Sequence, residues 1–551
     1  MVIIAVFCPD RNRKSVNVRK TFRHRRRFLL FFAKKYGGFS AKYDREFLKK
    51  RWFFQFRGVM IGILLSGNFT KILRFLVFRR TFMARSSTKS YEIDMLNGAI
   101  FPKLLRFAVP LTLSTMLQLL FNAADVVVVG RYAGDNSLAA VGSNTALINL
   151  LTNLFLGLSI GANILAARHY GAHEDEELSK TVHTSILLSI YSGLLLTVVG
   201  ILGARTILEW MQCPDDVLGL ATTYLRIYFA GQTATMLYNF GAALLRAGGD
   251  TQRPLYFLFA AGIVNVVLNL VFVIKFQMDV AGVALATVIS QCISAALVIR
   301  CLMKETGPLR LDLRQLKIYP MKLKQIMQVG IPAGIQGILF SLANVTVQSS
   351  INSFDDTTLV AASSAASSIE NFVYANVNAF YQANTAFTSQ NFGAGNYRRI
   401  LRIRHIAVAT GTISTFLLGF LAILFGHQLL GIYSPSEAVI QAGMVRMHYL
   451  MLFYGLDALM DVQVGSMRGI GYNITPMLVT LVGACLFRLV WLGTVFQIPA
   501  YHTIEMVYIV YPISWVITSI AHMIAFHFAY RRTMRRVHHT GDTHPAEAAV
   551  S

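Results

Sequence analysis

Apolar stretches of about 20 residues recur along this chain from Phe107 to Tyr530, separated by short polar segments. A helix rises about 1.5 Å per residue, so a stretch of this length crosses the roughly 30 Å hydrocarbon core of a bilayer. Helices are expected because every backbone polar group inside lipid must be satisfied within its own segment. The pattern therefore predicts an all-α membrane protein with twelve transmembrane helices. The predicted spans are 107–129, 138–166, 183–203, 217–244, 254–274, 281–299, 325–351, 359–389, 406–425, 437–463, 474–497 and 506–530.

The two halves of this pattern match each other at a fixed offset of 222 residues. Each half holds six spans, an even number, so both halves enter the membrane from the same side and the repeat is parallel. Two such halves can face each other around a central cleft that opens to either side, which favours transport. The matched pairs are Pro110 and Pro332, Asn122 and Asn344, Arg246 and Arg468, Gly249 and Gly471, Pro254 and Pro476, and the segments His169–Ala172 and Asn391–Ala394.

The spans and the loop charges divide the chain into lobes and orient it. We predict an N-lobe at 83–299, a cytoplasmic linker at 300–324, a C-lobe at 325–535 and a polar C-terminal tail at 536–551. Counted from Met83, the loops predicted to be inside and both tails carry 24 Lys/Arg, whereas the outside loops carry three. Because basic residues accumulate on the cytoplasmic side, both termini are expected in the cytoplasm.

Most of the formal net charge of +24 lies in one terminal segment. Residues 1–82 hold 21 Lys/Arg against 3 Asp/Glu, a net charge of +18, and the rest of the chain carries only +6. The body therefore gives no indication of nucleic-acid binding. The segment is interpreted either as a basic amphipathic anchor on anionic lipid or as an extension that is disordered or not translated because synthesis starts at Met83. We favour the second interpretation.

Polar residues inside the first-half spans are candidates for ion coupling, because charge at membrane depth is costly and marks ion or substrate paths. Asp125 is a candidate carrier of a proton or sodium ion, and the alternative is a carboxyl group hydrogen-bonded inside the bundle. Asn265 and Asn269 lie one helical turn apart in the fifth span and could offer amide oxygens to sodium. Hydrogen bonds between helices are the alternative for these two residues. The sixth span adds Thr287.

The second half carries a different set of polar residues. Asp457 and Asp461 lie one turn apart on the tenth span, and two carboxylates that close are expected to share a proton. Glu370 in the eighth span is a further candidate. Each acidic residue could instead be a structural partner of Arg446 or Arg488, the latter in the middle of its span.

Aromatic residues of the eighth span, Tyr381 among them, could line a cavity for flat cationic molecules through cation–π contacts. Core packing is the alternative. No GxxxxGK[ST] motif and no HExxH motif occur in the chain, so neither an ATP-driven pump nor a zinc protease is indicated. The five cysteines are scattered and predict no metal site and no disulfide framework. A secondary transporter driven by an ion gradient remains.

Several segments together resemble the multidrug and toxic-compound extrusion (MATE) transporters over roughly residues 98–535. The resemblance implies a twelve-helix fold of two lobes that exports cationic or amphipathic molecules and drugs in exchange for inward H⁺ or Na⁺. The segments that carry it are Asn122–Gly130 (NAADVVVVG), Arg168–Ala172 (RHYGA), Leu245–Thr251 (LRAGGDT) with Arg253 and Pro254, Gln390–Asn396 (QNFGAGN), and Met467–Gly471 (MRGIG) with Pro476.

The same resemblance suggests roles for the first-half residues. Asp125 matches the first-helix aspartate that the family associates with ion coupling. Asn265 and Thr287 look like members of the family's N-lobe cation site. Asn269 stands where the family has a fifth-helix aspartate, so one carboxylate of that site is missing here. This departure favours a proton carried by Asp125 over a tightly held sodium ion.

In the second half the resemblance is less complete. Asp457 resembles the tenth-helix aspartate of the sodium-coupled branch, but Phe340 stands in place of that branch's seventh-helix glutamate. Arg488 lies 222 residues after Val266, at a depth where the first half keeps its polar residues. We expect Arg488 to offset Asp457 or Asp461 electrostatically.

The sequence therefore predicts an ion-coupled antiporter of a bacterial inner, or plasma, membrane, working by alternating access. We expect no cofactor besides the coupling ion, H⁺ or Na⁺, and a monomer whose partners are small cationic or amphipathic substrates and membrane lipid, not nucleic acid. The first alternative is a flippase for lipid-linked intermediates, which should have a more basic central cavity. A membrane-embedded enzyme or a sensor is the remaining alternative, although neither an acid/base constellation nor a sizeable soluble domain is evident.

Overall fold

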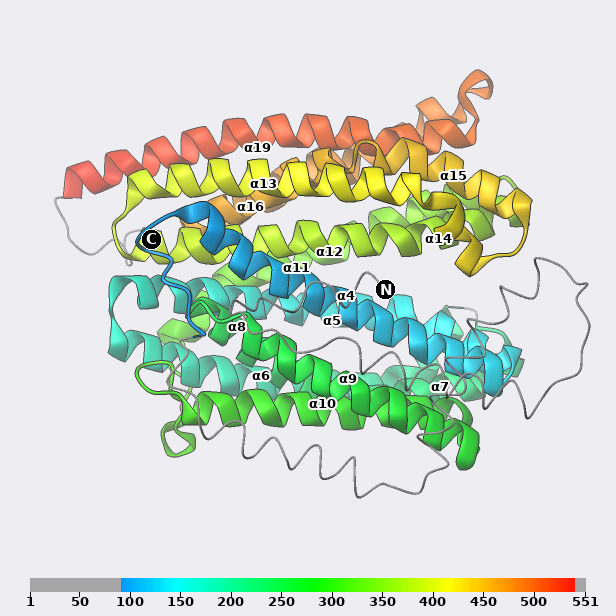
Figure 1. Ribbon diagram of the computed structural model, residues 1–551, viewed down its shortest axis with the longest axis horizontal. Coiled ribbons are helices and arrows are strands. Elements are labelled where there is room, and N and C mark those ends of the chain that lie inside the picture. The colour runs from blue at the N-terminus through cyan, green and yellow to red at the C-terminus, as the bar shows by residue number, and fades with distance from the viewer. Residues whose placement is uncertain (1–90, 212, 541–551) are drawn as a thin grey trace, which may run out of the picture. The chain divides into compact units, whose positions relative to one another are not determined.

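The computed structural model describes residues 91–211 and 213–540, and within these ranges it contains helices and no strand (Figure 1). The predicted extension at 1–82 and residues 541–551 of the predicted tail lie outside the described residues. The first half comprises α4 (Ile100–Tyr132), α5 (Asp135–Ala172), α6 (Asp175–Trp210), α7 (Asp215–Ala230), α8 (Gln232–Ala247), α9 (Gln252–Leu270) with the π-helical turn η1 (Val271–Lys275), and α10 (Asp279–Lys304).

After a short 3-10 turn, η2 (Leu313–Gln315), the second half follows in the same order. It comprises α11 (Pro320–Asn352), α12 (Thr357–Gly393), α13 (Tyr397–Leu424), α14 (Gly426–Tyr433), α15 (Glu437–Met451), α16 (Tyr454–Gly469), α17 (Ile474–Thr480), the π-helical turn η3 (Leu481–Leu486), α18 (Phe487–Gly493), the 3-10 turns η4 (Val495–Gln497) and η5 (Pro499–Tyr501), and α19 (Ile504–Thr540).

All twelve predicted spans coincide with these helices, so the prediction of two six-helix halves is confirmed. Nine of the described helical segments are long and apolar enough to cross a membrane by length and composition alone. The other three predicted spans do not meet this criterion, for reasons that the structure shows. Two of them, α7–α8 and α15–α16, break into helices of 15 or 16 residues. The third, α12, is long but rich in buried Ser, Thr, Asn and Gln.

Both broken spans bend at the same position of the repeat. The first bend is at Gly231, where an added Cβ would lie 2.7 Å from a methyl carbon of Val288 on α10. The second is at Phe453, which is 222 residues further on and has no glycine or proline beside it within the bend. The bend is therefore a property of the repeated fold, and a glycine occupies the bend position itself in only one of the two copies.

Helix ends differ from the predicted boundaries at the linker and the tail. α10 continues to Lys304 and α11 begins at Pro320, so the connection is shorter than the predicted linker at 300–324. The proline at the start of α11 lacks an N–H that would be unsatisfied there in any case. α19 runs to Thr540 and so includes the first residues of the predicted polar tail at 536–551.

The two halves meet where glycines let backbones touch. α5 packs on α11 through Gly157 and Gly161 on one helix and Gly330 and Gly334 on the other. A Cβ added at Gly157 would lie 2.3 Å from the backbone nitrogen of Gly334, and one at Gly161 would lie 2.4 Å from the carbonyl oxygen of Ile326. Small residues allow such close approach between membrane helices, so this crossing admits no larger side chain.

A reciprocal pair of hydrogen bonds joins the halves at the ends of their helices. Arg168 Nη2 of α5 donates to the carbonyl oxygen of Gly469 at 3.5 Å. Its repeat mate on α12, Gln390, donates from Nε2 to the carbonyl oxygen of Ala247 at 2.6 Å. Gly469 and Ala247 are themselves repeat mates and end α16 and α8. Each half therefore donates a hydrogen bond to a carbonyl group at a helix end of the other half, where the helix itself supplies no donor.

Two repeat-related glycines make this contact possible. A Cβ added at Gly171 would lie 2.0 Å from the carbonyl oxygen of Gln390, and one at Gly393 would lie 2.0 Å from that of Arg168. These distances are far below van der Waals contact, so only glycine fits at either position. The RHYGA and QNFGA segments thus contain a structural joint between the halves.

The first helix, α4, contributes to both halves. Along its length α4 packs against α9 of its own half and against α12 of the other. One of the buried apolar clusters contains Phe107 and Ala108 of α4 together with Ala383 and Phe387 of α12, and the rings of Phe107 and Phe387 meet edge to face at 5.7 Å. α4 is thus a physical connection between the two lobes.

The close packing of α5 on α11 predicts that adding one methyl group lowers stability at some positions of α5 and not at others. We expect Gly161→Ala to destabilise the protein by about 1–3 kcal/mol, because the new Cβ overlaps a backbone oxygen and overpacking costs that much. Gly142→Ala on the same helix is the matched control, since nothing lies within 4 Å of its added Cβ and alanine favours helix. Thermal unfolding of the two purified variants measures the difference, and equal melting temperatures would contradict the packing described here.

Candidate functional site

All four polar residues predicted for the first half come together in one buried cluster. Asp125 lies on α4, Asn265 and Asn269 on α9, and Thr287 on α10. Asp125 is 7% exposed, Asn265 4% and Asn269 1%. The cluster forms because α9 packs against both α4 and α10 and turns its asparagine face toward them.

Asp125 is the acceptor at the centre of this cluster. Asn269 Nδ2 donates a short hydrogen bond to Asp125 Oδ1, and Thr287 Oγ1 donates to Asp125 Oδ2 at 3.2 Å. Asn265 Nδ2 donates to Thr287 Oγ1 at 3.2 Å, and Asn269 Nδ2 also reaches Asn265 Oδ1 at 3.3 Å. The carboxylate thus ties α4 to α9 and α10 through charge-assisted hydrogen bonds, which are stronger than neutral ones.

The asparagine at position 269 changes what the cluster can hold. An aspartate there would repel Asp125, whereas the amide of Asn269 donates to it. Within the described residues nothing donates to the other amide atom, Asn269 Oδ1, which is buried. A buried acceptor without a donor is unusual and fits a site that offers oxygen to a positive species. The cluster therefore has one carboxylate, a free amide oxygen and a hydroxyl group.

In the second half, Glu370 is held in a buried ion pair. Arg446 of α15 donates from Nε to Glu370 Oε1 at 2.8 Å and from Nη2 to Oε2 at 3.0 Å, and its Nη1 reaches Ser363. The guanidinium also lies 5.6 Å from the ring centroid of Tyr508. This bidentate geometry is the structural alternative that the sequence left open for Glu370, because both carboxylate oxygens are occupied.

The two aspartates of α16 have fewer partners. Tyr374 Oη donates to Asp461 Oδ2 at 3.4 Å. Asp457 is 6% exposed, and within the described part of the chain no side chain donates a hydrogen bond to it. Arg488 forms no ion pair with either aspartate within 4 Å among the described residues. Its Nε donates to Ser514 Oγ at 3.0 Å, and its guanidinium lies 4.2 Å over the ring of Tyr511.

The polar clusters of the two halves occupy different positions of the repeat. The residue 222 positions after Asp125 is Val347, and the one after Asn269 is Trp491. Conversely, Asp457 corresponds to Thr235 in the first half. The repeat therefore preserves the backbone arrangement, while each half carries its own set of ionisable groups.

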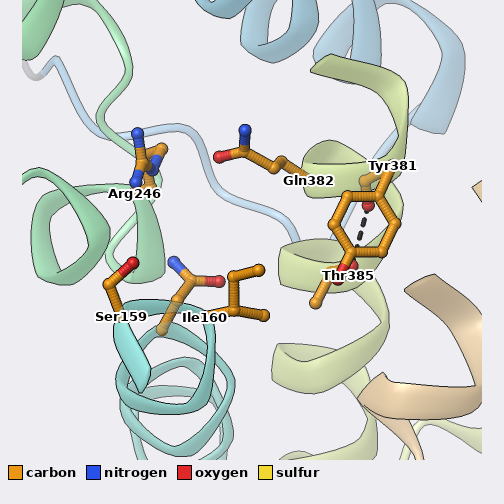
Figure 2. A pocket seen from close by; sticks show the side chains of 7 residues that line it. Ser159, Ile160, Arg246, Tyr381, Gln382 and Thr385 are labelled. Atoms are coloured by element: carbon orange, nitrogen blue, oxygen red, sulfur yellow. Dashed lines mark hydrogen bonds between the residues drawn. The ribbon is translucent and has the colours of Figure 1, made fainter. Parts of the chain in front are cut away.

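Tyr381 lines a small pocket between the halves (Figure 2). The cavity has a volume of about 20 Å³, and its walls come from α5, α8 and α12. Tyr381 Oη accepts a short hydrogen bond from Arg468, whose Nη2 donates to Gln336 Oε1 at 2.7 Å. The lining residues are Ser159, Ile160, Asn163, Arg246, Tyr381, Gln382 and Thr385.

Of the seven residues that line this pocket, the sequence predicted only Tyr381 as a site residue, and Arg246 and Gln382 are two of the six that it missed. Arg246 lies two residues beyond the predicted fourth span, so it was counted among the basic residues of a cytoplasmic loop. Gln382 lies inside the eighth span but carries no charge. The match between Arg246 and Arg468 in the repeat could have identified Arg246 as a site residue. It places the two arginines at equivalent positions, near the C-terminal ends of α8 and α16.

Comparison with known proteins agrees with this architecture. The MatE family model matches residues 110–271 and again residues 332–492, so its two copies begin 222 residues apart. "Probable multidrug resistance protein YoeA" of Bacillus subtilis is 27% identical over 68% of this chain and 82% of its own length. Multidrug export protein MepA of Staphylococcus aureus is 22% identical over 69% of this chain and 81% of its own length.

Two solved structures share the fold. A multidrug resistance MATE family transporter of the MOP superfamily, in an outward-facing conformation, superposes with a TM-score of 0.73 at 22% identity over 81% of this chain and 98% of its own. A MATE structure in a bent conformation gives a TM-score of 0.72 at 20% identity over 85% of this chain and all of its own. At this level of identity the likeness concerns the fold.

The ion pair of the second half predicts a large loss of stability when one partner is removed. Glu370→Gln should destabilise the protein by about 3–5 kcal/mol, because it leaves the Arg446 guanidinium buried without a counter-charge. Adding Arg446→Met should recover much of that loss. Asp457→Asn serves as the matched control and should change stability little, since no side chain donates to that carboxylate. Thermal unfolding in detergent distinguishes these outcomes, and a double variant as unstable as Glu370→Gln would argue against the pairing.

Proposed function

Because this chain belongs to the MatE family of multidrug efflux transporters, we propose that it exports small cationic or amphipathic molecules in exchange for an inward-moving ion. The family consists of transporters and not of enzymes. The described helices make this a multi-pass membrane protein. The family resemblance and the short loops favour a bacterial inner membrane, and the distribution of basic loops supports a cytoplasmic location for both termini. We further expect the monomer to be the working unit.

The observation that carries this proposal is the Asp125 cluster. A buried carboxylate that accepts hydrogen bonds from two neighbouring helices can hold either a charge or a proton. In its charged form it binds the amide of Asn269 and the hydroxyl of Thr287. A proton on the carboxylate weakens the bond from Asn269, because the accepting oxygen loses its negative charge and the bond is no longer charge-assisted. Proton uptake therefore loosens α4 from α9.

The position of α4 connects this event to the rest of the protein. α4 packs against α12 of the second lobe through a buried apolar cluster, as well as against α9 of its own lobe. A change at Asp125 is therefore in a position to alter how the lobes fit together. Coupled exchange requires that ion and substrate prefer different conformations, and α4 supplies a physical link for that difference.

We propose H⁺ as the coupling ion in preference to Na⁺. The cluster has one carboxylate, and Asn269 takes the place at which a second carboxylate would have completed a more negative site. A hard cation such as Na⁺ is bound most tightly by several negative or strongly polar oxygens. One carboxylate in a buried cluster suits a single proton.

A flippase for lipid-linked intermediates is the second candidate. The observation that favours it is Arg246, a basic residue that lines the pocket between the halves. A lipid carrying a phosphate would need such a cation along its path. The transport experiment described next separates this candidate from multidrug export.

Asp125→Asn should abolish dye export. In pump-deficient bacteria, the full chain is expected to lower accumulation of fluorescent cationic dyes, and the variant should return accumulation to that of cells without the protein, at equal expression. The control is Asp216→Asn, the same substitution at an exposed position in the first turn of α7, which should export normally. Full export by Asp125→Asn would remove that carboxyl from the coupling path. If the intact chain lowers accumulation of none of several dyes, the flippase candidate gains.

The identity of the coupling ion has its own test. Inverted membrane vesicles with an acid interior and no sodium should take up dye, because outward H⁺ flow from the vesicle drives substrate in the opposite direction. A sodium gradient without a pH difference should drive little uptake, and fluorescence quenching of the dye measures both. Sodium-driven uptake of equal size would overturn the choice of H⁺.

A further inference from the structure

The pocket between the halves is built from repeat-related pairs. Residue pairs 222 positions apart face it from α5 and α12, so the cavity lies on the approximate symmetry axis that relates the lobes. In transporters made of parallel repeats, the interface between the repeats is where substrates bind. The pairs are Ser159 with Tyr381, Ile160 with Gln382, and Asn163 with Thr385.

One cation lines this pocket without a protein partner. Within the described residues nothing accepts a hydrogen bond from Arg246 and no carboxylate lies within 4 Å of it. Two buried arginines of the second half do have partners: Arg446 pairs with Glu370, and Arg488 contacts Ser514 and Tyr511. Arg246 is half-buried, and withdrawing a cation from water without a counter-charge is costly. We therefore expect Arg246 to bind a group that is not part of this chain.

Arg468, the residue 222 positions after Arg246, shows that only one of the two equivalent arginines lacks a protein partner. Arg468 occupies the equivalent position in the second half, but it donates to Tyr381 Oη and to Gln336 Oε1. Its guanidinium is therefore engaged by the protein. The two halves thus present one arginine whose terminal nitrogens are bound by the protein and one available arginine to the same interface, which defines a single site instead of two.

The rest of the pocket suits a polar ligand atom. Figure 2 shows Arg246 and Gln382 extending from opposite sides toward the same space, with Ser159 below Arg246. No acidic residue lines the cavity. Its volume of about 20 Å³ exceeds the roughly 10–15 Å³ that one water molecule requires, so it admits a single oxygen-sized group in this conformation.

We propose that Arg246 binds the oxyanion, carboxylate or phosphate, of the molecule that this transporter carries. This inference rests on the proposed export function and predicts that, among its substrates, molecules that bear an acidic group, zwitterions included, bind most tightly. A guanidinium presents N–H donors in a fork that matches carboxylate and phosphate oxygens. The remainder of the ligand lies outside the small cavity, and the lobes must separate to admit it.

Equilibrium binding of a matched dye pair tests the site. The probes are a rhodamine ethyl ester, which is a cation, and the corresponding free acid, which is a zwitterion with the same ring system. Fluorescence anisotropy with the purified full chain gives both dissociation constants. We expect wild type to bind the acid more tightly than the ester. R246Q should weaken binding of the acid about tenfold or more, as expected for loss of a charge-assisted hydrogen bond, and leave the ester within about twofold.

Two further variants serve as controls. R246K keeps the charge and should keep most of the preference for the acid. R226Q removes a different arginine, which is exposed on α7, and should leave both dissociation constants unchanged. The proposal is overturned if R246Q weakens both dyes equally, if it keeps the preference for the acid, or if wild type binds the acid no better than the ester. Binding requires no transport, so loss of acid binding in R246Q supports the site even if neither dye is exported.

A competition experiment on the wild-type protein needs no variant. It distinguishes a soluble ligand from a lipid headgroup as the source of the oxyanion. In nanodiscs of phosphatidylcholine, displacement of the acid dye by acetate or inorganic phosphate supports the site with a soluble ligand. Displacement only when phosphatidylglycerol replaces part of the lipid supports the site with a lipid headgroup. If neither treatment displaces the acid dye, the oxyanion site is refuted.

Discussion

Direct contact between the backbones of the two halves is the constraint on which the rest of this structure depends. At the crossing of α5 with α11, and again where the ends of α5 and α12 meet, glycines bring main-chain atoms so close that no side chain could intervene. Arg168 and Gln390 then exchange hydrogen bonds with carbonyl groups of the opposite half. Because these contacts tolerate neither added bulk nor a small shift, the interface is suited to discrete arrangements and not to gradual deformation.

Polar chemistry is distributed around this interface without following its symmetry. The first lobe holds a carboxylate that accepts from an amide and a hydroxyl group, and the second holds a bidentate ion pair and two aspartates on one helix. Exchange of an ion for a substrate needs sites that respond differently to the same movement. A repeated backbone with diverged side chains meets that need, because the two lobes share a similar backbone geometry but carry unlike charges.

The sequence predicted the first-half cluster well, because Asp125, Asn265, Asn269 and Thr287 are polar positions in otherwise apolar helices and all four meet. It predicted less for the second half. Glu370 and Arg446 were each recognised as out of place, but their pairing depends on how α12 packs against α15. Arg246 was overlooked for a related reason: it lies at the end of an apolar stretch, where a basic residue ordinarily faces water.

By itself the sequence determined the twelve hydrophobic spans, the 222-residue repeat and the positions at which polar groups enter the membrane, because hydropathy and periodicity are properties of consecutive residues. Only the tertiary structure decided which of these groups meet. Arg246 and Arg468 occupy the same position of the repeat, yet one is held by Tyr381 and Gln336 and the other faces a cavity. That difference depends on side chains that lie 87 and 132 positions away in the sequence. Tertiary packing brings them together, and local sequence does not encode it.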